Sequence, residues 1–196
     1  MKIRKIRRIT LRNWKNFLQV DVATPRRLFL VGPNASGKSN FLDAFRFLRD
    51  LATPGGGLQE AVRRRGGVSA IRCLAARRYP DVTVGVVVEA DAEEWEYELS
   101  FNQDNRGRPM VRKEQVRRGG ETLLNRPDDV PEEQSDSARL TQTYLEQVNV
   151  NQPFRLLADF FASIRYLHIV PQLIREPDRS VGRREDPFGG DFFWSR

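Results

Sequence analysis

The sequence has little cysteine and little histidine. Among its 196 residues there is one cysteine, Cys73, and one histidine, His168. A single cysteine excludes a disulfide within the chain, and one cysteine with one histidine cannot complete a tetrahedral zinc site. So little cysteine is typical of proteins from a reducing compartment, and we therefore expect the protein in the cytoplasm.

Long apolar runs are also missing. The longest, residues 82–88, is interrupted by Thr83 and Gly85, whereas a helix needs about 20 apolar residues to cross a bilayer. Residues 1–12 interleave arginine, lysine and isoleucine, unlike the continuous apolar stretch of a secretory signal. We therefore expect a soluble protein with no membrane partner.

Acidic residues are scarce in the first part of the chain. Residues 1–78 hold 18 Lys+Arg against 4 Asp+Glu, whereas residues 79–196 hold 15 against 22. A basic region attracts polyanions such as DNA or nucleotide phosphates. Arginine outnumbers lysine 28 to 5, which also fits a compositional bias of the genome and an ordinary solvated surface. Charge alone leaves both interpretations of the basic region open.

The hydrophobic pattern predicts an α/β chain with one substantial core. Alternation of apolar and polar residues, together with turn residues, indicates the order of the elements. Two strands come first, followed by a short apolar strand, a helix with one apolar stripe, an antiparallel meander and further helices. The expected strands are residues 3–11, 20–22, 27–31, 82–90, 94–101, 110–118, 121–125 and 164–170, and the expected helices are residues 40–51, 58–65, 138–148 and 153–163.

We interpret residues 1–174 as one domain. Within it lie a phosphate-binding loop at 32–39, the meander at 82–125 and a helical lobe at 137–163. Residues 175–196 are rich in proline, glycine and charge and lack periodicity, so we expect an irregular tail.

The chemistry is concentrated in one glycine-rich loop. Residues 32–39 match the Walker A pattern G-x-x-x-x-G-K-[ST], and the loop lies between a predicted buried strand and a predicted helix, as that pattern requires. The predicted nucleotide-binding residues of the loop and the helix start are Gly32, Pro33, Asn34, Ala35, Ser36, Gly37, Lys38, Ser39 and Asn40.

Each fixed position in the pattern has a physical role. Gly32 and Gly37 permit backbone turns that aim successive N–H groups at phosphate oxygens. Lys38, at a helix N-terminus, can neutralise the β- and γ-phosphates, and the Ser39 hydroxyl can coordinate magnesium. The sequence therefore predicts binding of ATP with Mg²⁺.

Two stretches together resemble the start of an ABC-type ATPase head. Residues 9–17 read ITLRNWKNF, and residues 32–44 read GPNASGKSNFLDA. Among such heads the chain is most similar to the RecF, SMC and OLD-like branch, often described as AAA family ATPases. The resemblance implies a P-loop NTPase fold with an ABC-head-like mixed sheet, an antiparallel meander and a helical lobe.

The resemblance also implies site residues and partners. In such heads the turn that contains Lys15 and Asn16 lies near the nucleotide, and Gln172 occupies the place of a glutamine that reaches magnesium and the attacking water. Two heads sandwich ATP, so the expected partner is a second copy or a chain that supplies the missing half of the head. DNA and a nuclease or effector subunit are further candidate partners.

Several family motifs are missing from these 196 residues. We find no apolar strand ending in Asp-Glu, no Ser-Gly-Gly-like signature and no switch histidine after such a strand. We therefore expect an incomplete head that hydrolyses ATP only after completion and dimerisation. The leading hypothesis is an ATP-driven switch in DNA repair or in defence against foreign DNA. The alternatives are a nucleotide-binding regulatory module without hydrolysis and a transporter-associated ATPase.

Overall fold

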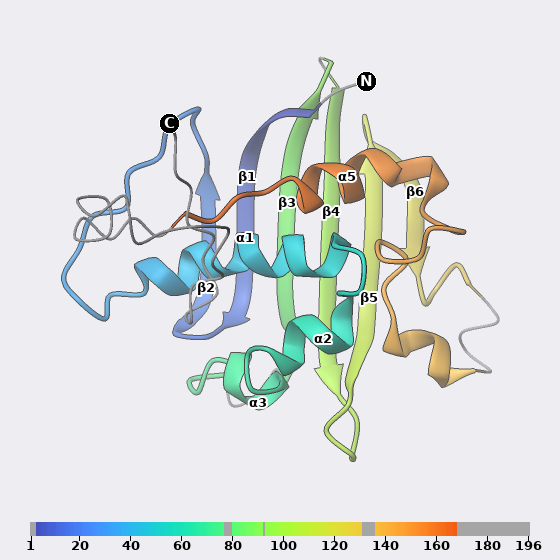
Figure 1. Ribbon diagram of the computed structural model, residues 1–196, viewed down its shortest axis with the longest axis horizontal. Coiled ribbons are helices and arrows are strands. Elements are labelled where there is room, and N and C mark those ends of the chain that lie inside the picture. Colours follow the sequence, from blue (N-terminus) through green and yellow to red (C-terminus); the bar gives the residue numbers. More distant parts are fainter. Residues whose placement is uncertain (1–2, 77–79, 92, 131–135, 168–196) are drawn as a thin grey trace, which may run out of the picture.

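The computed structural model describes residues 3–76, 80–91, 93–130 and 136–167. Its centre is one six-stranded sheet in the order β2-β1-β3-β4-β5-β6, in which every neighbouring pair is antiparallel (Figure 1). The strands are β1 (Ile3–Trp14), β2 (Phe17–Ala23), β3 (Val82–Ala90), β4 (Glu93–Gln103), β5 (Pro109–Arg118) and β6 (Glu121–Arg126). The predicted α/β class and antiparallel meander are confirmed.

The two faces of the sheet differ in polarity because side chains alternate along each strand. Val86 on β3 faces Tyr97 on β4 in the register, and both are buried. Their neighbours Val87 and Glu96 point to the opposite face, where charged side chains are frequent. Helices cover the apolar face, and the core lies between them and the sheet (Figure 1).

The helix that follows the glycine-rich loop provides most of this cover. This helix, α1 (Lys38–Ala52), lies across the sheet with α5 (Arg155–Ala162) beside it (Figure 1). Its Phe47 ring lies 5.2 Å from Trp14 of β1 and 5.3 Å from Phe101 of β4, measured between ring centroids. Aromatic pairs at this spacing stabilise a core beyond the area that they bury.

Short helices complete the fold. They are α2 (Leu58–Arg63), α3 (Val68–Ile71) and the 3₁₀ segments η1 (Ser137–Thr141) and η2 (Gln152–Phe154). The predicted helix at 58–65 is confirmed as α2, whereas α3 was not predicted. No helix within the described ranges is long and apolar enough to span a membrane.

The strand predicted at residues 27–31 is wrong for this structure. Residues 28–33 belong to no strand, and Phe29 and Val31 are 82% and 94% exposed. A strand needs a neighbouring strand to satisfy its backbone N–H and C=O groups. None of the described strands lies beside this segment in the sheet, so Phe29 and Val31 remain in solvent, whereas Leu30 packs partly against the core.

The helix predicted at 138–148 is also wrong, because a buried carboxylate competes for its backbone. Only Ser137–Thr141 forms a 3₁₀ turn. The N–H groups of Tyr144 and Leu145 donate to the Glu114 carboxylate, at 2.7 and 3.1 Å, instead of to helical carbonyls. Within the predicted helical lobe, α-helix is therefore limited to Arg155–Ala162.

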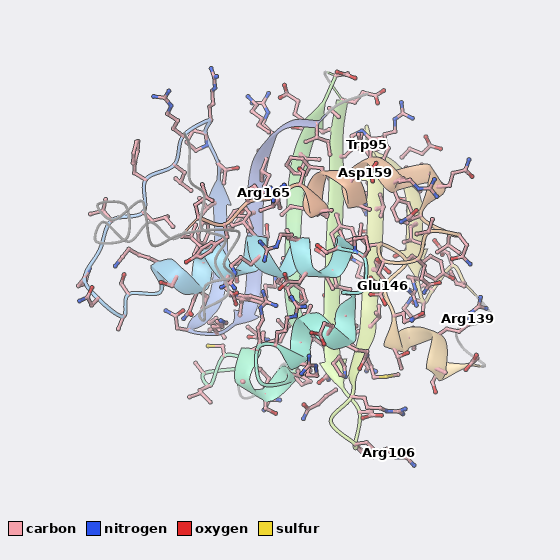
Figure 2. All side chains as sticks on the ribbon, viewed as in Figure 1. Trp95, Arg106, Arg139, Glu146, Asp159 and Arg165 are labelled. Atoms are coloured by element: carbon pink, nitrogen blue, oxygen red, sulfur yellow. The ribbon has the colours of Figure 1, made fainter. Side chains whose placement is uncertain are left out.

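Glu114 belongs to a buried polar cluster that ties this segment to the sheet. Its carboxylate also accepts hydrogen bonds from Arg126, at 3.0 Å, and from the Tyr97 hydroxyl, at 3.1 Å. Nearby, Glu146 (labelled in Figure 2) accepts the backbone N–H of Leu58 at the start of α2, at 2.8 Å. The buried Glu114 and the half-buried Glu146 thus fix the position of a segment that has little regular structure.

The strand predicted at 164–170 lies only partly within the described residues. Residues 164–166 have no strand structure, Leu167 forms a β-bridge, and residues 168–170 lie outside the described residues. Gln172, His168 and the predicted irregular tail also lie outside them.

Candidate nucleotide-binding site

The glycine-rich loop turns sharply just before α1. Gly37 is the N-cap residue and has φ +96°, a left-handed conformation that favours glycine. A Cβ at this position would overlap the Asn16 side-chain amide and would lie 2.8 Å from Cζ of Phe17. Glycine is therefore required both by the backbone conformation and by the β1–β2 turn packed against it.

A second left-handed residue lies inside the loop. Ala35 has φ +64°, which is uncommon for a residue with a Cβ, and the N–H of Ser36 donates to the carbonyl of Pro33 at 3.3 Å. The loop is thus a compact turn that is exposed to solvent ahead of the helix N-terminus. Such turns concentrate N–H groups and favour anions.

The Lys38 side chain folds back over this loop. Its ammonium donates to the carbonyls of Gly32 and Pro33, at 2.8 and 2.7 Å, and lies 3.5 Å from Oγ of Ser36. A lysine ammonium has three donors and no acceptor, so these contacts are suited to a cation. The structure therefore places the Lys38 ammonium over the loop at which it is predicted to neutralise phosphates.

Ser39 follows Lys38 in the first turn of α1 and is exposed. Its hydroxyl is available to a magnesium ion whose other ligands would be phosphate oxygens and water, which is the usual arrangement for Mg²⁺ with nucleotides. No cluster of three or more His, Cys, Asp or Glu residues that could hold a metal occurs in the described part of the chain. The Ser39 hydroxyl therefore fits a magnesium ion that binds together with the nucleotide.

The β1–β2 turn is bound directly to the start of α1. The Trp14 indole N–H donates to the backbone carbonyl of Asn40 at 2.7 Å, and the Asn40 side-chain amide donates to Oδ1 of Asn16 at 2.8 Å. Asn16 and Asn40, both predicted site residues, are thus in contact although 24 positions separate them. The loop, the helix start and the β1–β2 turn form one continuous group.

Lys15 has a different partner from the expected nucleotide. Its backbone is left-handed, with φ +52°, and its ammonium forms a 2.7 Å ion pair with Asp43 on α1. Asp43 is also paired with Arg65, at 3.0 Å. Burial alone would raise the pKa of Asp43, but Arg65 and Lys15 outweigh burial and lower that pKa below its usual value.

Sequence reasoning missed Asp43 and Arg65. A signal was present, because Asp43 and Asp50 are seven positions apart and therefore lie on one face of a helix whose neighbours are apolar. Two carboxylates on a buried helix face require cations. Nothing local in the sequence, however, identifies Arg65 as their partner.

Comparison with protein families places this geometry in a known group. Residues 28–186 match the family model described as "AAA domain, putative AbiEii toxin, Type IV TA system". The chain belongs to this family. A second model, "P-loop containing region of AAA domain", matches residues 6–49, the stretch that contains most of β1, the β1–β2 turn, β2, the loop and most of α1. Membership accounts for the P-loop, the fold class and the resemblance to the ATPase heads named above.

Solved structures with similarity include two of the recombination mediator protein RecF in the RecFOR pathway. For RecF-ATP, the identity is 21%, the match covers 61% of this chain and 28% of that chain, and the TM-score is 0.39. For RecF-ATPrS, the identity is 16%, the match covers 88% of this chain and 33% of that chain, and the TM-score is again 0.39. The chain thus spans a third or less of the length of these RecF chains. A search of curated proteins finds no match.

Proposed function

We propose that this AAA-domain chain binds ATP together with Mg²⁺ at residues 32–40 and forms the nucleotide-binding part of a RecF-like ATPase head. One observation supports the proposal above all others. The Lys38 ammonium is already positioned over the loop, on the carbonyls of Gly32 and Pro33. A triphosphate would supply stronger acceptors than these neutral carbonyls, so the ammonium would exchange its partners at little cost.

Hydrolysis, in this proposal, requires groups from elsewhere. A P-loop ATPase needs a group that orients or activates the attacking water in addition to the phosphate-binding loop. Asp43, the carboxylate of α1 closest in sequence to Ser39, is occupied by Lys15 and Arg65. The completing groups would come from a second copy or another chain segment, and Gln172 stays a predicted contributor to magnesium and water positioning.

The biological role that we propose is an ATP-driven switch in DNA repair or in defence against foreign DNA. The family description names a putative AbiEii toxin of a type IV toxin–antitoxin system, and the RecF structures concern a recombination mediator. The surplus of arginine and lysine in residues 1–78 supports contact with a polyanion. DNA, a second copy of the chain and a nuclease or effector subunit are the proposed partners.

A module that binds nucleotide without hydrolysis is the second candidate. The observation that favours it is the ion pairing of Asp43, which leaves that carboxylate unsuited to act as a general base. In such a module, ATP binding alone would change the contacts that the chain makes with its partner.

Two measurements on the purified protein test these proposals. Calorimetry with ATP, in Mg²⁺ and then in EDTA, should show tighter binding in Mg²⁺ for the wild-type protein. Ser39→Ala should reduce that difference, because Ser39 is the proposed magnesium ligand. Equal binding in both buffers would contradict the role of Mg²⁺. Phosphate release in the same samples, with and without DNA, separates the switch, which hydrolyses when assembled, from the module, which does not.

A further inference from the structure

Asp43 receives cations from two different parts of the chain. Lys15 approaches it from the β1–β2 turn, with Nζ 2.7 Å from Oδ2. Arg65 approaches from beyond α2, with Nε 3.0 Å from Oδ2 and an Nη atom 3.1 Å from Oδ1. Arg46, on the same helix as Asp43, adds a third cation with an Nη atom 3.7 Å from Oδ1. A carboxylate with three cationic partners can lose one of them and remain neutralised.

Arg65 is fixed in its place. Its side chain is 6% exposed, it also pairs with Asp50 at 2.9 Å and donates to the carbonyl of Ala61 at 2.7 Å, and its guanidinium lies 5.3 Å from the centre of the Phe47 ring. Moving it away would leave a buried guanidinium without its two carboxylates and would deprive Asp43 and Asp50 of their shared cation, which is strongly unfavourable. Arg65 therefore remains with Asp43.

Lys15 is less constrained than Arg65. Its side chain is 25% exposed, and within the described ranges its ammonium makes the Asp43 ion pair alone. The backbone beside it is anchored, because Asn16 accepts a hydrogen bond from Asn40. A lysine has a flexible four-carbon stem, so the ammonium can change partner while the turn stays in place.

The predicted phosphate and magnesium site lies within reach. Ser39 and Asp43 are four residues apart on α1 and therefore lie on the same helix face, about 6 Å apart along the helix axis. The β1–β2 turn also packs against Gly37, at the end of the loop. A triphosphate bound at the loop would thus present several negative charges close to Lys15.

We propose that Asp43 competes with the nucleotide for Lys15, so that the Lys15 ammonium leaves Asp43 for a phosphate oxygen when Mg-ATP binds, while Arg65 keeps Asp43 neutralised. This inference rests on the proposed function. It makes Lys15 a nucleotide-responsive contact, and it makes Asp43 and Arg65 positioning residues that set nucleotide affinity. The β1–β2 turn then carries a contact that reports nucleotide occupancy to the edge of the sheet.

A double-mutant cycle tests the exchange, with the dissociation constant for Mg-ATP measured by calorimetry. Asp43→Asn should tighten binding about three- to tenfold, because Lys15 no longer has to leave an ion pair. Lys15→Met should weaken binding by a similar factor. In the Lys15→Met background, Asp43→Asn should change the constant less than about twofold. The same tightening in both backgrounds would mean simple removal of a negative charge and would overturn the proposal.

Controls separate binding from folding. Asp50→Asn also removes a carboxylate from Arg65 but does not contact Lys15, so it should leave the dissociation constant within about twofold of wild type. Thermal unfolding without nucleotide identifies any variant that fails to fold. If Asp43→Asn does not fold, Lys15→Met decides alone, because an unchanged affinity in that variant contradicts the exchange. Absence of binding by the wild-type protein would instead contradict the proposed function.

Discussion

The indole N–H of Trp14, the last residue of β1, donates a 2.7 Å hydrogen bond to the backbone carbonyl of Asn40 in the first turn of α1. Trp14 is completely buried, and its ring also contacts Phe47 further along the same helix. The sheet and the helix that follows the P-loop are therefore joined by both a polar and an apolar contact. The position of the loop depends on this junction.

Replacing Trp14 by phenylalanine should reveal the hydrogen bond. The indole N–H of Trp95 (labelled in Figure 2) is also buried but has no hydrogen-bond partner among the described residues, so Trp95→Phe is a matched control. We expect Trp14→Phe to lower the free energy of unfolding by about 1 kcal/mol more than Trp95→Phe does. Urea unfolding of both variants measures the difference. Equal losses would mean that the Trp14 hydrogen bond contributes nothing.

Replacing Gly37 by alanine should damage both stability and nucleotide binding. Gly107, at the hairpin tip beside Arg106 in Figure 2, also has a positive φ, but a Cβ there would meet nothing within 4 Å. Gly107→Ala should therefore cost about 1 kcal/mol from backbone strain alone. Gly37→Ala adds a collision with Asn16 and Phe17 and should cost about 2 kcal/mol or more. A Gly37→Ala variant that is as stable as Gly107→Ala would contradict the packing of the turn on the loop.

Replacing Glu114 by glutamine should destabilise the fold strongly. The change removes the Glu114 carboxylate charge beside the buried Arg126 and sets the amide N–H₂ against the N–H group of either Tyr144 or Leu145. The expected loss is about 3 kcal/mol or more in the free energy of unfolding. Glu94→Gln, on the exposed side of β4, should change it by less than about 0.5 kcal/mol. The free energy of unfolding of both variants is measured in urea. Similar losses in the two variants would show that the buried cluster does not hold the 137–151 segment in place.

Acid should remove the contribution of Asp43 to stability. Its pKa is lowered in the folded state despite burial, because Arg65 and Lys15 favour the ionised form. The stabilisation is therefore present above the unfolded-state pKa of about 3.9 and is lost as the pH falls through the lower folded-state pKa. Asp43→Asn should show a shallower loss of stability below about pH 4 than the exposed control Asp129→Asn. If the free energy of unfolding depended on pH in the same way in both variants, the pairing of Asp43 with Arg65 and Lys15 would be contradicted.

The P-loop helix and the meander could be predicted from the sequence because their signals are local. The loop has a fixed spacing of glycine, lysine and serine, and residues such as Trp95, Tyr97 and Leu99 alternate with glutamates along β4. Local signals failed where distant groups decide the structure. The carboxylate of Glu114 draws the backbone of Tyr144 away from a helix, and the apolar segment with Phe29 forms no strand because no described strand pairs with it.

In the candidate site, too, local sequence patterns predicted some residues, whereas contacts between distant residues could not be predicted. The sequence predicted Lys38 and Ser39 from the motif, and the resemblance to ATPase heads suggested Lys15 and Asn16. The pairing of Lys15 with Asp43 depends on a turn that lies 28 positions earlier in the chain, which no local pattern encodes.

The most direct test of the central claim is calorimetric titration of Lys38→Ala with Mg-ATP beside wild type and Lys113→Ala. Lys113 is a matched control because its ammonium pairs with Glu98 on the sheet, away from the loop. We predict that wild type and Lys113→Ala bind with similar affinity, whereas Lys38→Ala loses measurable binding while its thermal unfolding is unchanged. Equal heats of binding for all three proteins would contradict the assignment of residues 32–39 as the phosphate-binding loop.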